Sequence, residues 1–148
     1  MIDGLNQTEA DRLIAIRKRA ESTTPVGLPD FGGNVAVPLV SLDARDAFTL
    51  DVARGRLDLR KGTNQLRTQQ VLILVRLDYN GAPHRNPDEE EIASPHLHLY
   101  RQGWGDKWAI PLPDGAFTNL SDHWTTLQDF LRYCSVVEPP DFRRGLFS

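Results

Sequence analysis

The sequence predicts an α+β fold: one antiparallel sheet of five or six strands, covered on one face by an N-terminal and a C-terminal helix. Apolar residues have helical spacing near both ends of the chain, and they alternate with polar residues over much of residues 34–112. No repeat, low-complexity tract or linker-like stretch interrupts this order. A chain of 148 residues suits one core, so we expect residues 1–148 to form a single domain.

The first element should be a helix over residues 8–22. Thr8 is a suitable N-cap, and the acidic residues that follow it suit the positive end of a helix. Leu13 and Ile14 begin an apolar stripe at helical spacing. Pro25 disfavours helical backbone at the residue before it, so the helix should end ahead of it.

Residues 34–112 should be mainly strands. The segment 34–42 is apolar enough for a strand, although Pro38 indicates an edge or a bulge. Apolar and polar residues alternate over residues 48–60. We therefore predict two strands in that segment, joined by a turn near Gly55.

The polar segment 61–70 should connect to a central strand at 71–79, whose odd-numbered positions are all apolar. The loop 80–95 is long for a connection between two strands, and loops of that length are often functional. Residues 96–101 and 106–112 should form a second hairpin around a Gly-Trp-Gly turn.

The last element should be a helix over residues 121–135, with Ser121 as its N-cap. Its apolar stripe comprises Trp124, Leu127, Phe130, Leu131 and Cys134. Residues 136–148 should form an irregular tail.

Composition excludes several classes of protein. No stretch approaches the roughly 20 apolar residues needed to span a bilayer, and the N-terminal segment lacks the pattern of a signal peptide. We therefore expect a cytoplasmic protein that does not contact membranes. The single Cys134 rules out an internal disulfide and a multi-cysteine zinc site. The phosphate-binding and serine-hydrolase glycine motifs are also absent.

Two neighbouring strands should bring ionisable side chains together. If residues 71–79 and 95–101 pair antiparallel, the leucines at 97 and 99 share the buried face with Val75 and Leu77. The opposite face should then carry His96, His98, Tyr100, Arg76 and Asp78. The adjoining loop adds His84, Arg85, Asn86 and Asp88.

Three interpretations of this face compete. His96 and His98 could bind a metal ion, with His84 or Asp88 completing the site. They could instead act as base and acid on a phosphodiester without a metal. The face could also be a docking surface for another macromolecule, with aromatic and arginine anchors.

Four stretches carry a resemblance: "LDVARGRLDL", "RLDYNGAPHRNPD", "HLHLYRQGWGDKWA" and "TLQDFLRYC". They resemble a family of small bacterial proteins of unknown function, met in genomes rich in prophages and mobile elements. The resemblance covers about residues 48–135 and implies a bacterial, cytoplasmic, single-domain protein, with no activity assigned. The Arg-Leu-Asp strand, the Pro-His-Arg-Asn loop and the His-rich strand are also similar in pattern to small RNA-cleaving toxins of toxin–antitoxin pairs.

Our leading hypothesis is a toxin-type, metal-independent ribonuclease or phosphodiesterase that uses no cofactor. The expected catalytic residues are His96, His98, His84, Tyr100 and Asp78, and the expected substrate-binding residues are Arg76, Arg67, Arg85, Asn86 and Trp104.

The alternative is a non-enzymatic interaction protein from a prophage or mobile element. Its partner would be a protein, either an antitoxin or a host defence complex. The acidic run 88–91 suits this alternative, because clustered carboxylates can mimic nucleic acid toward a basic partner.

Overall fold

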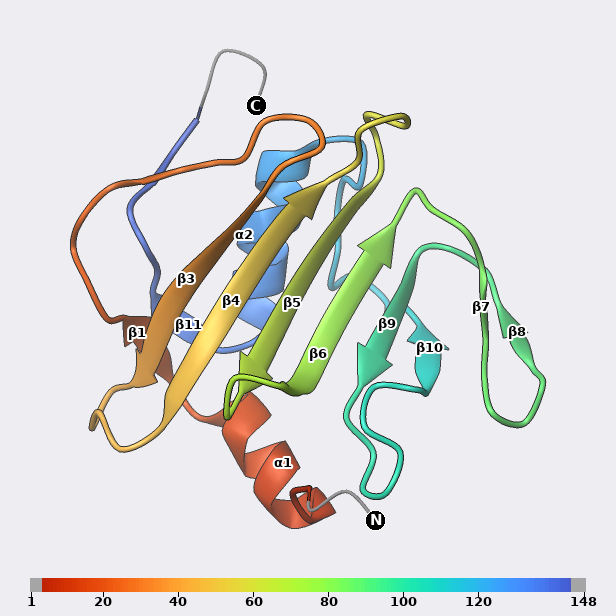
Figure 1. The fold of residues 1–148 in the computed structure, drawn as a ribbon, viewed down its shortest axis with the longest axis horizontal. Helices are drawn as coiled ribbons and strands as arrows, with labels where there is room; N and C mark the ends of the chain where they lie inside the picture. The colour runs from red at the N-terminus through yellow and green to blue at the C-terminus, as the bar shows by residue number, and fades with distance from the viewer. Residues whose placement is uncertain (1–3, 145–148) are drawn as a thin grey trace.

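The computed structural model describes residues 4–144. Its elements, shown in Figure 1, are α1 (Gln7–Ala15), β1 (Lys18–Ala20), β2 (Val26–Gly27), β3 (Asn34–Ser41), β4 (Ala47–Arg54), β5 (Gly62–Thr68), β6 (Leu72–Tyr79), β7 (His84–Arg85), β8 (Glu91–Ile92), β9 (His96–Leu99), β10 (Ala109–Pro111), α2 (His123–Tyr133), β11 (Val136–Glu138) and β12 (Phe142–Arg143).

The main sheet confirms the α+β class but has more strands than predicted. Its order is β10-β9-β6-β5-β4-β3-β1-β11, which gives eight strands in place of five or six. The neighbours pair antiparallel except β1 and β11, which are parallel. The sequence prediction missed β1 and β11 because each has only three residues, too few to show a period.

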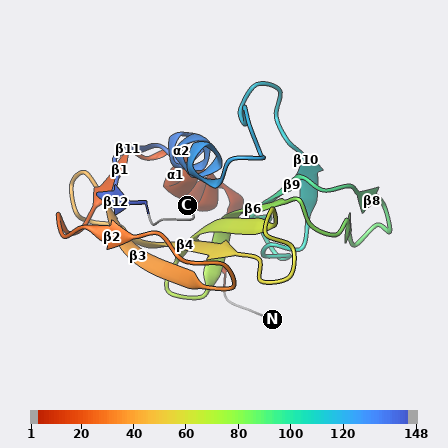
Figure 2. The ribbon, with the colours of Figure 1, turned by 90° about the horizontal axis from the view of Figure 1, so that it is seen from above.

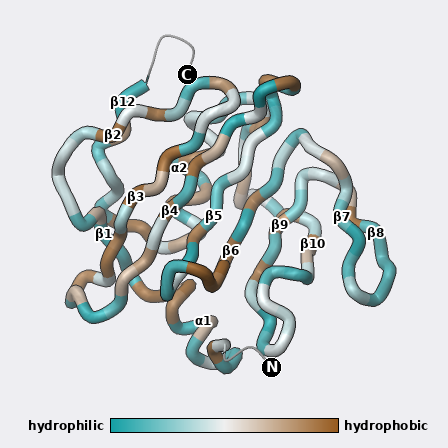
Figure 3. Tube along the Cα trace, in the orientation of Figure 1, coloured by the Kyte–Doolittle hydropathy of each residue, from teal (hydrophilic) through white to brown (hydrophobic). Residues whose placement is uncertain are grey.

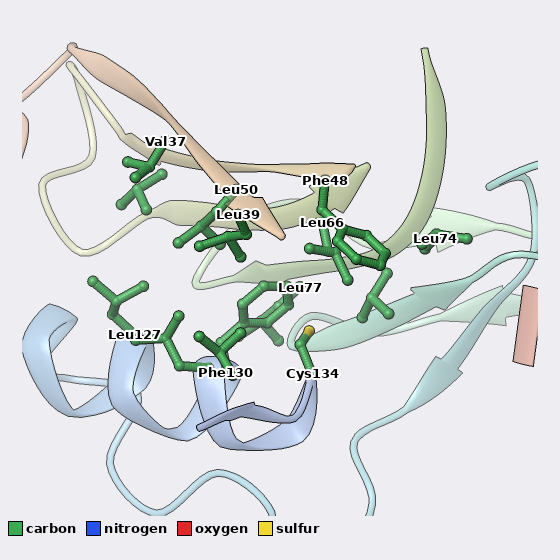
Figure 4. Close-up of a cluster of buried hydrophobic side chains, with 14 of the residues drawn as sticks. Val37, Leu39, Phe48, Leu50, Leu66, Leu74, Leu77, Leu127, Phe130 and Cys134 are labelled. Atoms are coloured by element: carbon green, nitrogen blue, oxygen red, sulfur yellow. The ribbon is translucent and has the colours of Figure 1, made fainter. Parts of the chain in front are cut away.

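Both helices lie on the same side of the sheet (Figure 2). Leu127 and Phe130 of α2 point toward Leu50, Leu66 and Leu77 of the sheet, and together they form the centre of the core (Figure 4). The opposite face carries no helix. Neither helix among residues 4–144 is long and apolar enough to cross a membrane.

The N-terminal helix is shorter than the predicted range of 8–22. It ends at Ala15, because Ile16 already has extended backbone angles. The following segment, Lys18–Ala20, pairs with β3 on one side and with β11 on the other. Those backbone hydrogen bonds outweigh the helix propensity of the segment, although lysine, arginine and alanine are all good helix formers. The N-cap is Asn6 in place of Thr8, and its side chain accepts a hydrogen bond from the backbone N–H of Glu9 (2.8 Å).

The second half of the predicted 48–60 hairpin is a loop. The backbone N–H of Gly55 donates to the carbonyl of Lys61 (2.9 Å), and Leu57 is 97% exposed. The partner of β4 is β5, which was predicted to be a polar connection. Hydropathy missed β5 because its buried positions are Gly62, Asn64, Leu66 and Thr68, of which only Leu66 is strongly apolar.

A bulge interrupts β6. Its register with β5 skips Leu74, so Leu74 and Val75 are both buried although they are adjacent. The regular alternation predicted for 71–79 is therefore wrong at its start: Val71 lies outside the strand and is 78% exposed. Beyond the bulge the alternation holds, with Leu77 and Tyr79 buried.

The C-terminal helix keeps its predicted apolar stripe, but its boundaries differ from 121–135. It begins after Asp122, which replaces Ser121 as the N-cap and accepts from the N–H of Thr125 (3.1 Å). The predicted irregular tail contains β11 and β12. Figure 3 shows how hydrophobic stretches follow α2 and the start of β6, whereas the tip of the β7–β8 ribbon is hydrophilic.

A buried lysine joins the ends of the two helices. Lys18 is 0% exposed, and its Nζ donates to the carbonyls of Ile14 (2.8 Å), Ile16 (2.8 Å) and Cys134 (2.7 Å). Helix C-termini leave carbonyls without intrahelical partners and favour a cation. Burial lowers the pKa of Lys18 to about 8.

Candidate functional site

The site begins with the pairing of β6 and β9. Asp78 lies opposite His96, and Arg76 lies opposite His98, in an antiparallel register. Opposed residues project from the same face of a sheet, so these four side chains share the face that carries no helix. Leu97, opposite Leu77, lies in the core on the other side. The predicted pairing of these strands, and the face assigned to these residues, are confirmed.

Three imidazoles converge here. The ring centroids of His96 and His98 are 5.0 Å apart, and His84 of β7 brings a third ring within 4.5 Å of His98 and 5.8 Å of His96. Nε2 of His84 is 2.8 Å from the carbonyl oxygen of Lys107. A carbonyl can only accept, so Nε2 carries the proton and Nδ1 is left as an acceptor.

Asp78 lies between the two strand histidines. Its Oδ2 is 3.4 Å from Nε2 of His96 and 3.2 Å from Nε2 of His98. Its Oδ1 accepts a hydrogen bond from the hydroxyl of Thr63 (3.0 Å). Burial alone would raise the pKa of Asp78, but the hydrogen bond from His98 and the charge of Arg76 outweigh it and hold that pKa well below its usual range.

The main chain fixes how both strand histidines are protonated. Nδ1 of His98 is 2.8 Å from the carbonyl of Asp106, and Nδ1 of His96 is 3.4 Å from the carbonyl of Ala93. Both Nδ1 atoms must therefore donate. Nε2 of each ring then faces Asp78, as a lone pair when the ring is neutral and as a donor when the ring is protonated. The side chains are almost completely buried. Burial, followed by the charge of His98, lowers the pKa of His96 and favours its neutral form.

Arg76 is held by three groups of the site. It donates from Nε to Oδ2 of Asp78 (3.2 Å), from one terminal nitrogen to Asp106 (2.7 Å) and from the other to Nε2 of His98 (3.1 Å). Nε2 of His98 therefore faces a guanidinium that donates a proton and a carboxylate that accepts one. A single ring nitrogen cannot satisfy both neighbours in one protonation state.

These side chains line a cavity of about 250 Å³. We call it the histidine cavity; its chemically active lining is Lys61, Arg76, Asp78, His84, His96 and His98. A second, shallower cavity of about 540 Å³ extends over β4 and β5 on the face without helices. The two cavities share Thr63, Arg76 and Asp78 in their linings, so they lie next to each other.

Two predicted site residues have structural contacts elsewhere. Tyr100 does not share the histidine face: it lies in the core, and its hydroxyl donates to the carbonyl of Leu5 (2.8 Å). The chain leaves strand geometry after Leu99, so the two-residue period does not reach Tyr100. Asn86 is buried and exchanges two hydrogen bonds with the backbone of Ala109 (2.9 and 2.8 Å), which fastens the loop to β10.

Three predicted substrate-binding residues lie outside the histidine cavity. Arg67 lines only the shallower cavity, where it forms two hydrogen bonds to Asp51 (2.6 and 3.1 Å). Arg85 is exposed on the β7–β8 ribbon. Trp104 is 45% exposed and lines a separate apolar cavity. Asp88, the other predicted metal ligand besides His84, is exposed near the tip of the ribbon and does not join the group of possible ligand atoms.

Three residues of the site were missed by the sequence analysis. Lys61 and Thr63 belong to the segment taken as a polar connection, and Asp106 lies in the turn after β9. Thr63 lies opposite Asp78 in the sheet. Correct assignment of β5 would have placed Thr63 beside the carboxylate of Asp78. Asp106 contacts Arg76 only through the tertiary fold, so no local pattern could have indicated it.

Comparison with known proteins identifies one family. The model of a family of unknown function, DUF6978, matches residues 5–136. This agrees with the resemblance to a family of unknown function, and it assigns no chemistry to the site. No curated protein matches the chain, and no solved structure matches it.

Proposed function

Because the chain belongs to DUF6978, a family of unknown function, we propose its activity from the site itself: cleavage of phosphodiester bonds in single-stranded RNA. One observation carries the proposal. Three imidazoles converge on a cavity that Lys61 and Arg76 also line. Imidazoles exchange protons near neutral pH, and ammonium and guanidinium groups bind phosphate.

His84 is the best-placed base. It is partly exposed, whereas His96 and His98 are 2% and 1% exposed. The Lys107 carbonyl holds the proton of His84 on Nε2, so Nδ1 can take the proton of a ribose 2′-hydroxyl. The 2′-oxygen attacks phosphorus as the bond to the 5′-oxygen breaks, and the leaving oxygen takes a proton from solvent. The products are a 2′,3′-cyclic phosphate and a 5′-hydroxyl.

The two neighbouring cavities provide room for a single strand of RNA. Lys61 is exposed beside the imidazoles, where it would bind the scissile phosphate together with Arg76. The shallower cavity then accommodates flanking nucleotides over β4 and β5. Because Asp51 neutralises Arg67 there, we expect weak binding of these nucleotides and little preference for sequence.

The test is cleavage of a labelled single-stranded RNA oligonucleotide, with product ends read by mass spectrometry. We expect 2′,3′-cyclic phosphate ends and no cleavage of the DNA analogue, which lacks the attacking hydroxyl. His84→Ala should reduce the rate by about 100-fold or more, the size of a general-base contribution.

His123→Gln is the matched control, because His123 lies at the Tyr79 hydroxyl and outside the histidine cavity. It should retain the rate within about threefold. Loss of cleavage in His84→Ala, together with its retention in His123→Gln purified in the same way, excludes a contaminating nuclease. In a bacterial host, expression should arrest growth, and His84→Ala, which removes the base, should relieve the arrest. An inactive wild-type protein in both assays would contradict the proposal.

A second candidate function is docking of a protein with a basic surface. It is favoured by the β7–β8 ribbon, which carries four exposed acidic residues in a row at positions 88–91 and extends away from the rest of the sheet (Figure 1). Replacing these four residues by the corresponding amides should abolish such binding and leave RNA cleavage unchanged. The two functions are thus separable by one variant.

A further inference from the structure

The strand histidines and Asp78 have the spacing of metal ligands. Oδ2 of Asp78 is 3.4 Å from Nε2 of His96 and 3.2 Å from Nε2 of His98, and the three atoms all lie within 4.8 Å of one another. Ligand atoms about 2.0–2.1 Å from a tetrahedral ion are about 3.3–3.4 Å apart. The two measured separations therefore match two edges of a tetrahedral site without any movement of the backbone.

The surrounding hydrogen bonds orient these atoms for coordination. The carbonyls of Asp106 and Ala93 accept from the Nδ1 atoms and leave each Nε2 lone pair directed at the same point. Thr63 binds the other oxygen of Asp78. A ligating histidine that donates its second nitrogen to a carbonyl, and a carboxylate held by a neighbour, are the usual outer contacts of a metal centre.

A cation would also resolve the conflict among these atoms. The lone pair of neutral His96 faces a carboxylate oxygen, which offers only lone pairs. Arg76 compensates in part, because it donates to Asp78 and to Nε2 of His98. Its second terminal nitrogen stays anchored on Asp106, so the guanidinium can release His98 without leaving the site.

We propose that Asp78, His96 and His98 bind a divalent transition-metal ion of the zinc class, and that Arg76 releases Nε2 of His98 when the ion binds. Two nitrogen donors and one oxygen donor suit zinc or cobalt better than magnesium or calcium. All three residues line the histidine cavity, so a fourth position would remain for water or a phosphoryl oxygen. Three protein ligands with one open position are typical of catalytic zinc sites.

This proposal departs from the metal-independent chemistry expected from the sequence. From the sequence we considered His84 or Asp88 as the third ligand, whereas the structure places Asp78 of the neighbouring strand in that position. The binding claim does not depend on RNA cleavage. If RNA is the substrate, the ion would polarise a phosphoryl oxygen beside His84.

The test measures binding directly, with untagged full-length protein treated with a chelator and dialysed. Titration with zinc chloride, followed by calorimetry, should show one equivalent bound with a dissociation constant in the micromolar range or below. Cobalt(II) should give the visible absorption of a four-coordinate site. His96→Ala and His98→Gln should each weaken binding by at least about 10-fold.

Two further variants sharpen the result. His84→Ala is the matched control, because His84 contacts the same rings and is outside the ligand group; it should bind zinc within about threefold of wild type. Arg76→Ala removes a competing cation and should bind zinc more tightly. Circular dichroism of each variant checks that it folds.

The proposal is overturned if wild-type protein binds no zinc, if binding survives in both histidine variants, or if His84→Ala loses it as well. If the protein binds no zinc but still cleaves RNA in excess chelator, the proposed metal site is wrong and the proposed RNA cleavage is supported. If the protein binds zinc but does not cleave RNA, the metal site is supported and the proposed RNA cleavage is wrong.

Discussion

Two ionisable groups, the buried Lys18 and the partly buried Asp78, lie on opposite faces of the sheet and differ in the hydrogen bonds that surround them. On the helix side, Lys18 donates three hydrogen bonds to three main-chain carbonyls. On the side without helices, Asp78 lies between two imidazoles whose Nδ1 protons are already used elsewhere. The lysine has a matched acceptor for each donor. The carboxylate accepts from Thr63 and Arg76, and it also faces two imidazole nitrogens that present lone pairs whenever their rings are neutral.

We use this difference to separate polar groups with a structural role from those of the proposed site. A buried charge that is fully satisfied in one protonation state fixes the geometry of its neighbours. In other clusters the donors and acceptors cannot all be matched. We expect such a cluster to bind a ligand, such as a cation or a substrate, that supplies the missing partner. Burial alone does not distinguish the two, because Lys18, His96 and His98 are all buried.

The largest expected effect is the loss of the lysine. Lys18→Met keeps the aliphatic volume but leaves three buried carbonyls without their donor. We expect the free energy of unfolding to fall by about 3–5 kcal/mol, as when one partner of a buried ionic contact is removed. Chemical denaturation followed by circular dichroism measures this loss.

Lys61→Met is the control, because Lys61 is exposed and its replacement should change stability by less than about 0.5 kcal/mol. Equal stability of the two variants would show that the hydrogen bonds of Lys18 to the three carbonyls do not stabilise the fold. The contrast drawn between Lys18 and Asp78 would then be wrong.

A smaller effect is expected for a structural carboxylate. Burial would raise the pKa of Asp129, but hydrogen bonds from Thr118 and Arg132 lower it below its ordinary value. A lowered pKa in the folded state stabilises the protein above the unfolded pKa of about 4. That contribution is lost as the pH falls through the folded value.

Asp129→Asn should therefore cost about 1–2 kcal/mol at pH 7, and the difference from wild type should shrink as the pH is lowered below about 4. Denaturation at a series of pH values checks the sign. If the difference in free energy of unfolding between wild type and variant stays constant down to pH 2, Asp129 stabilises the protein through packing and not through its charge.

The smallest effect on stability is expected within the site. His96→Leu replaces an imidazole whose lone pair faces Asp78 by an apolar side chain. In chelator-treated protein at pH 7, we expect the free energy of unfolding to change by less than about 1 kcal/mol, because the hydrogen bond lost to the Ala93 carbonyl is long (3.4 Å) and the leucine side chain is well suited to a buried position. The same denaturation assay applies. A loss as large as that of Lys18→Met would identify His96 as a structural residue.

The predicted fold was most accurate where long apolar patterns exist. The α2 stripe and the β6–β9 pairing have regular periods and buried leucines, and both were found. β5 was missed because glycine, asparagine and threonine occupy three of its four buried positions. The α1 boundary was misplaced because pairing of Lys18–Ala20 with strands distant in sequence competes with local helix propensity.

The candidate site was predicted as far as its two strands and His84 of the adjoining loop. The convergence of His96, His98, Arg76 and Asp78 follows from a period of two residues and one correct pairing. Tyr100 was misassigned because the strand ends at Leu99. Asn86 has the chemistry of a binding residue, but it is buried and its amide exchanges hydrogen bonds with the backbone of Ala109.

The sequence by itself determined which residues alternate and therefore which side chains can share a face of the sheet, because that alternation is a local property of extended backbone. The tertiary structure alone decided which atoms of those side chains face each other. The carbonyls that orient the imidazoles come from Ala93, Asp106 and Lys107. Main-chain carbonyls are common to all residues, so no pattern of side chains in the sequence could reveal them.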